Sequence, residues 1–388
     1  MLYLDHAATT PVLPEALQGA WPYLTNEFGN PSSTHEAGLR AASALDWARQ
    51  TCADYLGCKK SEIVFTSGGT ESNNLAIKGI CLANPRGKHI ISARTEHTAV
   101  LECLDYLERH HGFQVSYLTL NADGIVAPET LEAVIRPDTT LVTLMLANNE
   151  TGAVQPIAQL AGIAATQKVP FHTDAVQATG WFDLNVTNLG VDALSLSGHK
   201  FGAPKGSGLL YLRNRYNPEP VIHGGGQEFG RRSGTQNVAW AVAVATALQT
   251  LSPGGNQQES NEARSAQSRS VTQAFIDAVL AQFANARLTG PADSGLRHPA
   301  IAAFTFEGVN GETLLLELER NGVSVSSGSA CAAGSQEPSH VLQALGISDD
   351  VCRTAVRFSF GHSAQMDQAT QALNALKTAM DSIARLGN

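Results

Sequence analysis

The chain of 388 residues is long enough for one large and one smaller domain, with a substantial core. A hydrophobic content of 43% and a charged content of 16% are typical of a globular enzyme and exclude general disorder. The formal net charge of −9, without a run of lysine and arginine, argues against nucleic acid or an anionic membrane as the main partner.

No stretch of the sequence has the pattern of a targeting or membrane segment. Residues Met1–His6 lack a basic region followed by an apolar one, and no apolar run approaches membrane-spanning length. We therefore expect a cytoplasmic protein that uses no membrane. The cysteines show no Cys-x-x-Cys spacing, which favours reduced thiols and no metal site. They are Cys52, Cys58, Cys81, Cys103, Cys331 and Cys352.

Strands and helices alternate over the first two thirds of the chain. The predicted strands are Glu62–Thr66, His89–Ser92, Gln114–Leu118, Leu141–Leu146, Phe171–Thr173 and Val191–Leu196. The predicted helices are Glu36–Leu56, Glu71–Ala83, Ala99–His110, Leu131–Ile135 and Ile157–Gln167. This alternation predicts an α/β fold with a mostly parallel sheet covered on both faces. In such sheets ligands bind beyond the carboxyl ends of the strands.

A polar, breaker-rich segment at Leu251–Gln258 indicates a domain junction. The elements predicted beyond it form a smaller α+β unit. They are the helices Ala263–Phe283, Gly311–Asn321 and Gln365–Leu386, and the strands Ile301–Phe306 and Ala355–Phe360. We predict a large domain of residues 15–252 and a small domain of residues 1–14 and 253–388.

The segment Ser197–Gly206 follows an apolar strand and contains Lys200. A lysine at the end of a core strand is desolvated, which favours its neutral amine and makes it a better nucleophile. This suits a Schiff-base lysine, and pyridoxal phosphate (PLP) is the cofactor that most often needs one. Taken alone, an ordinary surface lysine explains the motif equally well.

The segment Ser67–Ser72 lies between a strand and a helix and contains two glycines. The glycines allow a ligand to approach the free amides of the helix start, which favours an anion such as phosphate. The alternative is a plain helix cap made by Thr70 and Asn73.

Polar residues follow three other predicted strands. His97 is a candidate stacking partner and acid/base group, or else a structural histidine. Asn149 could meet a cofactor hydroxyl or form a turn, and Asp174 could pair with a protonated pyridine nitrogen or cap a helix. Because the strand ends of an open parallel sheet converge, we expect these groups to share one crevice.

Three later features also carry candidate residues. Gly224–Thr235 is a glycine-rich loop with two arginines that suits anion contact or simple flexibility. Ser326–Ser335 surrounds Cys331 with small residues, which predicts an accessible thiol on a mobile loop, suited to a sulfur or acyl shuttle. In isolation, Cys331 would be an unremarkable surface cysteine. The guanidinium of Arg357 could bind a substrate carboxylate bidentately, or Arg357 could simply lie at the edge of a strand.

Together these motifs resemble the PLP-dependent cysteine desulfurases of the NifS/IscS type, in the class V aminotransferase group. The resemblance runs from end to end of the chain. It is carried by Tyr3–Thr10, Phe28–Ser33, Thr66–Asn73, Thr95–His97, Asn148–Glu150, Ser197–Lys200, Arg232–Thr235, Ser326–Cys331 and Glu337–His340. It implies a PLP-dependent transferase fold of the aspartate aminotransferase-like type, fold type I.

The resemblance also implies a role for each strand-end residue. Lys200 would hold PLP as a Schiff base and take the Cα proton of the substrate. Asp174 would pair with the pyridine nitrogen, and Gln177 and Asn149 would face the ring hydroxyl. His97 would stack on the ring and take part in proton transfer.

Further implied residues bind the anionic groups. Those for the PLP phosphate are Gly69, Thr70, Ser197 and His199. Thr235 of a neighbouring subunit would complete that cup, which implies an obligate homodimer. Arg357, with the loop of Asn30 nearby, would hold the substrate carboxylate.

The implied activity is removal of sulfur from L-cysteine. Alanine would depart and leave a persulfide on Cys331, to be passed to an acceptor such as an iron–sulfur scaffold protein. A selenocysteine lyase and a PLP-dependent transaminase are alternatives within the family, and an idle sulfur carrier is one outside enzymes. The chain departs from the family pattern at Ala332–Ala333, where a hydroxyl residue often follows the cysteine.

Overall fold

The computed structural model describes residues 1–83, 85–252, 261–327 and 337–386. Its main sheet has seven strands: β2 (Ile63–Thr66), β3 (His89–Ser92), β4 (Gln114–Tyr117), β5 (Thr139–Thr143), β6 (Phe171–Asp174), β7 (Ala193–Ser197) and β8 (Gly208–Leu212). They lie in the order β2-β8-β7-β6-β5-β3-β4. Strand β8 is antiparallel to β2 and β7, and the other neighbours are parallel. The expected mostly parallel sheet is therefore confirmed.

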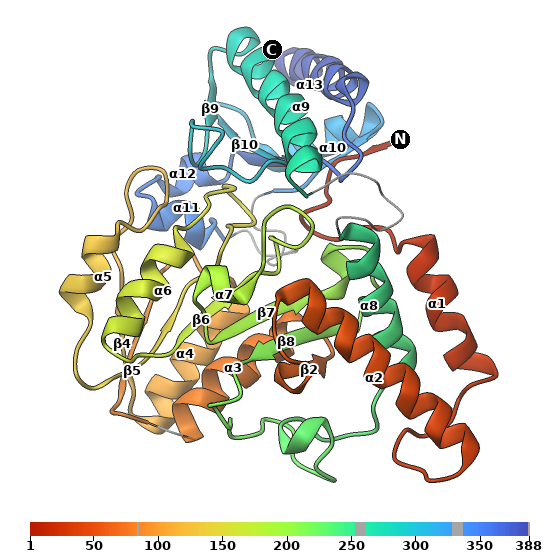
Figure 1. The fold of residues 1–388 in the computed structure, drawn as a ribbon. Coiled ribbons are helices and arrows are strands. Elements are labelled where there is room, and N and C mark those ends of the chain that lie inside the picture. Colours follow the sequence, from red (N-terminus) through yellow and green to blue (C-terminus); the bar gives the residue numbers. More distant parts are fainter. Residues whose placement is uncertain (84, 253–260, 328–336, 387–388) are drawn as a thin grey trace.

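Helices cover both faces of this sheet (Figure 1). One face packs on α3 (Gly69–Ala83) and α4 (Thr98–His111). The other packs on a larger group: α2 (Glu36–Leu56), α5 (Pro128–Val134), α6 (Ile157–Thr166), α7 (Val186–Leu189) and α8 (Val238–Leu251). Ile63 joins the core on the α2 side, and its neighbour Val64 joins the core on the α3 side. Because successive strand side chains point to opposite faces, each apolar run serves two cores.

A second, smaller sheet lies beyond the main one, with the order β12-β10-β9. Its antiparallel strands are β9 (Ala286–Leu288), β10 (Ile301–Phe306) and β12 (Ala355–Ser359). The helices α9 (Asn261–Gln282), α10 (Gly311–Arg320) and α13 (Met366–Leu386) share a core with it. Phe275, Phe304 and Phe358 pack edge to face in this core, with ring centroids 4.9 to 6.2 Å apart. The short helices α11 (His340–Ala344) and α12 (Asp349–Cys352) lie between the two sheets (Figure 1).

The N-terminal arm, which we define as residues 2–13, connects the two sheets. Its strand β1 (Leu2–Tyr3) pairs in parallel with β11 (Val323–Ser324). The arm then pairs with Ser359 of β12, and further on the amides of Thr10 and Leu13 bond to the turn after β7. The division of the chain into residues 15–252 and residues 1–14 with 253–388 stays a prediction.

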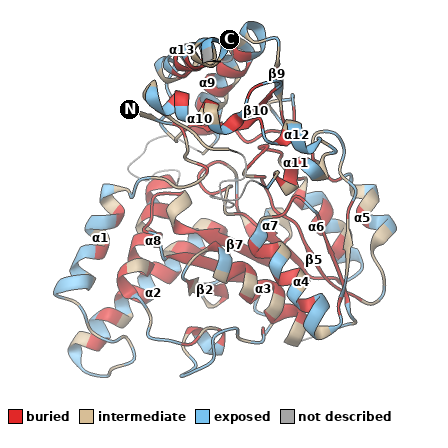
Figure 2. Cartoon of the chain, turned by 180° about the vertical axis from the view of Figure 1, so that it is seen from behind, coloured by how far each residue is buried: buried red, intermediate tan, exposed pale blue. Residues whose placement is uncertain are grey.

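Several elements were not expected from the sequence, among them β9, α7, α11, α12 and three longer ones around the main sheet. Helix α1 (Pro14–Thr25) packs against α8, and α8 is in turn buried between α1 and α2. Figure 2 shows α8 as one of the most continuously buried helices. Because α8 is apolar on every side, it has no helical periodicity that a sequence pattern could reveal. Strand β8 is the third, and its burial on both faces removes the alternation that marks exposed strands.

The cysteines of the described residues are free thiols. Four are buried and Cys58 is half-buried, and burial raises the pKa of Cys103 and Cys352 to about 11. Within the described ranges, no helix combines the length and the apolar character that a membrane crossing requires.

Candidate active site

A cavity of about 270 Å³ lies at the carboxyl ends of β5, β6 and β7, beside the start of α3. Ten of the residues singled out from the sequence line it. They are Gly69, Thr70, His97, Asn149, Asp174, Gln177, Ser197, His199, Lys200 and Arg357. Open parallel sheets bind their ligands at this edge. The structure therefore brings these residues from distant parts of the chain to one space.

Lys200 enters the cavity from a single 3-10 turn, η2 (Gly198–Lys200), that follows β7. The turn is held by hydrogen bonds from Gly198 to Ser207 O (2.9 Å) and from Phe201 to Gly198 O (3.1 Å). The half-buried Nζ donates to Ala7 O and, at 2.9 Å, to Ala8 O. Backbone carbonyls of the N-terminal arm thus hold the amine in place.

Asp174 ends β6 and presents its carboxylate to the cavity. Asn73 Nδ2 donates to its Oδ2 at 2.6 Å, and the Val176 amide donates to its Oδ1 at 3.0 Å. These two hydrogen bonds fix the orientation of the carboxylate at the cavity wall. A carboxylate in this position can pair with a protonated ring nitrogen.

A recess lies at the start of α3, next to the cavity. Its lining includes Ser67, Gly68, Gly69, Thr70, Ser197, His199 and Lys205, together with Glu71, whose carboxylate pairs with Arg232 at 2.8 Å. Free amides at a helix start attract negative groups. The backbone is tight here, because a Cβ on Gly208 would lie 2.5 Å from the Gly68 Cα. Only glycine at position 208 lets β8 approach the loop that shapes the recess.

His199 lies between the recess and the cavity. Its pKa is lowered to about 4, first by burial and then by the charges of Lys200 and Lys205. The ring is therefore neutral near pH 7, and its Nδ1 lies 3.2 Å from Thr9 Oγ1. A neutral imidazole can donate one hydrogen bond to an anion without adding a charge to the recess.

His97 caps α4, and its Nδ1 accepts a hydrogen bond from the Ala99 amide at 3.0 Å. The ring lines the cavity, and the cap leaves Nε2 as its protonated nitrogen when it is neutral. The preceding Glu96 is fully buried, and burial raises its pKa well above the usual range. Its Oε1 accepts from the Met145 amide at 2.8 Å, which joins the His97 loop to the end of β5.

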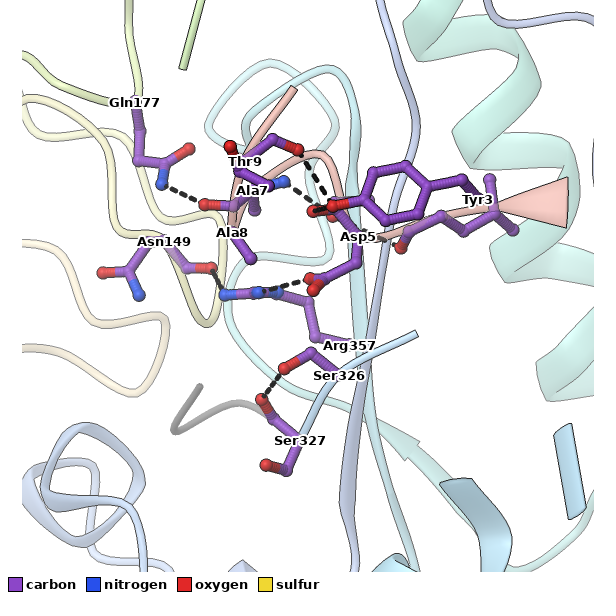
Figure 3. A network of polar contacts seen from close by, with 12 residues as sticks. Tyr3, Asp5, Ala7, Ala8, Thr9, Asn149, Gln177, Ser326, Ser327 and Arg357 are labelled. Carbon is purple, nitrogen blue, oxygen red and sulfur yellow. Dashed lines mark hydrogen bonds and ion pairs between the residues drawn. The ribbon is translucent and has the colours of Figure 1, made fainter. Parts of the chain in front are cut away.

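Arg357 closes the opposite side of the cavity from β12. Figure 3 shows its guanidinium between the Asp5 carboxylate and the Asn149 carbonyl. Nη2 lies 2.8 Å from Asp5 Oδ1, and Nη1 donates to Asn149 O at 2.7 Å. The same view shows Gln177 bonded to the arm, where its Nε2 donates to Ala7 O at 2.8 Å.

Among the described residues, two that the sequence singled out do not line this cavity. Thr235 lines a separate cavity of about 230 Å³ with Arg232 and Trp240. Asn30 is exposed in the loop between α1 and α2 and does not line the cavity. The loop packs closely on the start of α2, because a Cβ on Gly29 would lie 2.1 Å from Ala37 O. Cys331 lies outside the described residues.

The sequence reasoning missed several cavity residues. Asn73 was considered only as part of a helix cap, yet it follows Gly69 by four residues and so lies on the same face of α3. That spacing could have identified it. Ala7 and Ala8 act through their carbonyl oxygens, which no side-chain pattern reveals.

Comparisons with known proteins agree with this arrangement. A family model described as Aminotransferase class-V matches residues 2–371. The cysteine desulfurase IscS of Dictyoglomus turgidum is 41% identical over 383 residues, which are 98% of this chain and 95% of that one.

Two solved structures extend the comparison. A NifS-like protein superposes with a TM-score of 0.89 at 32% identity, covering 98% of this chain and 99% of its own. SspA in complex with cysteine gives a TM-score of 0.79 at 37% identity, covering 93% and 99%. The expected PLP-dependent transferase fold, fold type I, is thereby confirmed. The chain belongs to the class-V aminotransferase family and, within it, to the enzymes named cysteine desulfurases.

Proposed function

We propose that the chain is a PLP-dependent cysteine desulfurase, which converts L-cysteine to L-alanine and keeps the sulfur as a persulfide on Cys331. One observation carries this proposal. The amine of Lys200, the carboxylate of Asp174 and the start of α3 converge on one cavity. The relatives named cysteine desulfurase support the same reaction.

The donor set of the cavity fits PLP, which combines an aldehyde, a ring nitrogen, a ring hydroxyl and a phosphate. Lys200 would bond to the aldehyde carbon, Asp174 would hold the ring nitrogen, and the recess at Gly69 and Thr70 would take the phosphate. The amide of Gln177 lines the same cavity and suits the hydroxyl. When bound, PLP supplies an electron sink for the bond-breaking steps at the substrate.

The residues of the chain would then divide the remaining work. Lys200 would take the Cα proton of the bound substrate and later return it, because its side chain lines the cavity from the short turn η2. Arg357 orients the substrate through its carboxylate, with a guanidinium that is 1% exposed. His97 holds a proton at Nε2 and can deliver it within the cavity.

The sulfur step needs no outside oxidant or reductant. The Cys331 thiolate attacks the substrate sulfur, the carbon–sulfur bond breaks, and a sulfur–sulfur bond forms on Cys331. The carbon that loses sulfur gains a proton, which gives alanine. Cys331 follows the described residue Ser327 by four positions, and the backbone of Ser326 pairs with Arg357 (N–O distances of 2.7 and 3.3 Å). The segment that carries the thiol therefore begins beside the cavity.

We propose a homodimer for the working enzyme. Thr235 would complete the phosphate recess of the neighbouring chain, which accounts for its place in a separate cavity here. Large exposed apolar side chains support the proposal of a second copy: Trp21, Leu24, Phe28, Trp47 and Phe229 are 42 to 76% exposed. The sulfur would pass to an acceptor such as an iron–sulfur scaffold protein in the cytoplasm.

The test is to supply L-cysteine to the wild-type protein and to Cys331→Ala. We expect alanine and a mass increase of one sulfur on the Cys331 peptide of the wild type. Cys331→Ala should retain its PLP absorbance but form neither sulfide nor alanine at a comparable rate. Full-rate desulfurisation by Cys331→Ala would contradict the persulfide route. Parallel assays with L-selenocysteine and with an amino acid and keto acid pair would reveal a lyase or a transaminase.

A further inference from the structure

Asp5 contacts Arg357 from the side that faces away from the cavity. Its Oδ1 lies 2.8 Å from Arg357 Nη2, but Asp5 itself is not among the cavity-lining residues. The Arg357 side chain is 1% exposed and the Asp5 side chain is 19% exposed. The guanidinium therefore contacts the Asp5 carboxylate (Figure 3) and also lines the cavity, which Asp5 does not.

The position of Asp5 is fixed by the backbone around it. Ser359, two residues after Arg357 on β12, bonds to the arm on both sides of Asp5. The Ser359 amide donates to Leu4 O (2.7 Å), and the His6 amide donates to Ser359 O (3.3 Å). The Tyr3 hydroxyl lies 3.0 Å from Asp5 O and 3.0 Å from Thr9 O, which closes the arm on itself. The backbone of Asp5 is thus fixed relative to β12 by main-chain contacts.

Arg357 retains donors beyond those that the protein uses. Nη2 bonds to Asp5 and Nη1 bonds to Asn149 O, whereas Nε is buried without a hydrogen-bond partner among the described residues. A buried arginine with unused donors has the capacity to bind an anion. Without a nearby negative charge, it would hold any small anion that entered the cavity.

We propose that Asp5 is a positioning and specificity residue for the carboxylate site at Arg357, an inference that rests on the proposed function. The Asp5 carboxylate orients the Arg357 guanidinium toward the cavity and neutralises part of the guanidinium charge. The site then takes a planar monocarboxylate through directed hydrogen bonds, and it binds compact anions such as sulfate weakly. Position and charge are separable effects of one side chain.

Two substitutions separate these effects. Asp5→Asn keeps an oxygen acceptor for Nη2 but removes the charge, and Asp5→Ala removes both. Asp46→Asn is the matched control, because Asp46 forms an exposed ion pair with Lys60 (2.7 Å) on α2. The probes are inorganic sulfate and 3-mercaptopropionate, a carboxylate that has no amine with which to displace Lys200. Their dissociation constants are measured by calorimetry on the PLP-loaded protein.

We expect Asp5→Asn to bind sulfate about tenfold more tightly than the wild type, since a like charge near the anion has been removed. Asp5→Ala should bind 3-mercaptopropionate about tenfold more weakly than Asp5→Asn, because the fork is no longer oriented. Asp46→Asn should match the wild type for both probes. If Asp5→Ala does not fold, the sulfate measurement on Asp5→Asn still decides the charge effect.

The Arg357→Lys variant distinguishes a wrong role for Asp5 from a wrong assignment of the carboxylate site. If Arg357→Lys loses 3-mercaptopropionate binding but Asp5→Asn and Asp5→Ala behave as the wild type, the role of Asp5 is wrong and the carboxylate site stands. If Arg357→Lys binds 3-mercaptopropionate as the wild type does, the carboxylate site itself is wrong, and the inference is overturned with it.

Discussion

Two buried arginines of this protein each pair with a carboxylate, but their surroundings differ. Arg49 on α2 forms two parallel bonds to Glu228, from Nη1 to Oε2 and from Nη2 to Oε1, both at 2.7 Å. Gln236 and the Phe65 amide supply further donors to the same carboxylate, at 2.6 and 3.0 Å. Arg357 instead has one bond to Asp5 and a buried Nε without a partner among the described residues.

The difference separates a structural pair from a binding group. Arg49 is held between the rings of Phe65 and Phe229, each 5.0 Å from its guanidinium carbon, so a ligand could reach neither face. Glu228 has all its acceptor positions occupied, and it fixes the loop that leads to Thr235. Arg357 lines the cavity and keeps unused donors. A buried arginine with spare donors at a cavity wall is therefore the better candidate for substrate contact.

The largest effect on stability is expected from breaking the ion pair between Arg49 and Glu228. Arg49→Ala leaves Glu228 buried without its guanidinium, and we expect the unfolding free energy to fall by about 3–5 kcal/mol. Urea unfolding followed by circular dichroism measures this loss. A loss below about 1 kcal/mol would show that the pair is not the structural clamp described here.

Breaking the pair at the cavity should affect binding more than stability. Arg357→Lys keeps the charge but cannot span both Asp5 and Asn149 O. We expect kcat/KM for L-cysteine to fall by about 10–100-fold, the value of a charge-assisted hydrogen bond of about 1.5–3 kcal/mol. A stability loss as large as that of Arg49→Ala, with KM unchanged, would make Arg357 a structural residue too.

The pH dependence of stability separates the arginines from the buried histidines. The arginines keep their charge as the pH falls, whereas the histidines gain one. Burial lowers the pKa of His298 to about 4, and its Nε2 bonds to Gln177 O at 2.9 Å. Below pH 6.5 His298 is protonated in the unfolded chain, whereas in the folded chain it stays neutral down to about pH 4. Stability should therefore fall as the pH is lowered through this window, by up to about 1.4 kcal/mol per pH unit for this residue.

His298→Gln tests this contribution, since glutamine can donate to Gln177 O but does not titrate. Unfolding free energies of both proteins are compared at several pH values between 4 and 7. We expect a smaller slope for the variant between pH 4 and 6.5 and parallel curves above it. If the unfolding free energies of both proteins had the same slope against pH over the whole range, His298 would not contribute to the acid sensitivity.

The smallest effect is expected at the surface. Asp46 and Lys60 form an ion pair whose side chains are 59% and 48% exposed. Asp46→Asn should change the unfolding free energy by less than about 1 kcal/mol, because water and salt screen such pairs. A loss like that of Arg49→Ala would mean that burial is not what distinguishes these pairs.

Much of the site was predictable because it follows from local patterns. Asp174 ends a strand, and Lys200, Asn149 and His97 lie in the segments that follow strands; a parallel sheet gathers such positions at one edge. Strands β3 and β10 have the predicted bounds, whereas other boundaries moved by up to three residues, as for β5, which is Thr139–Thr143 rather than Leu141–Leu146. These shifts did not change which edge of the sheet carries the polar residues.

The parts that could not be predicted depend on contacts between distant segments. The pairing of Asp5 with Arg357 joins residues 352 positions apart, and no periodicity records it. The carbonyls of Ala7 and Ala8 that hold Lys200 have no sequence signature at all. Likewise, Arg357 lies on β12 at the edge of the small sheet, and no sequence pattern shows that it also lines the cavity.

The central claim is that Lys200 in this cavity carries the cofactor. Its most direct test is to add PLP to the protein, reduce it with borohydride and map the modified peptide by mass spectrometry. We predict a single pyridoxyl group on Lys200. A label on the neighbouring Lys205, or no label in a protein that still desulfurises cysteine, would contradict the account.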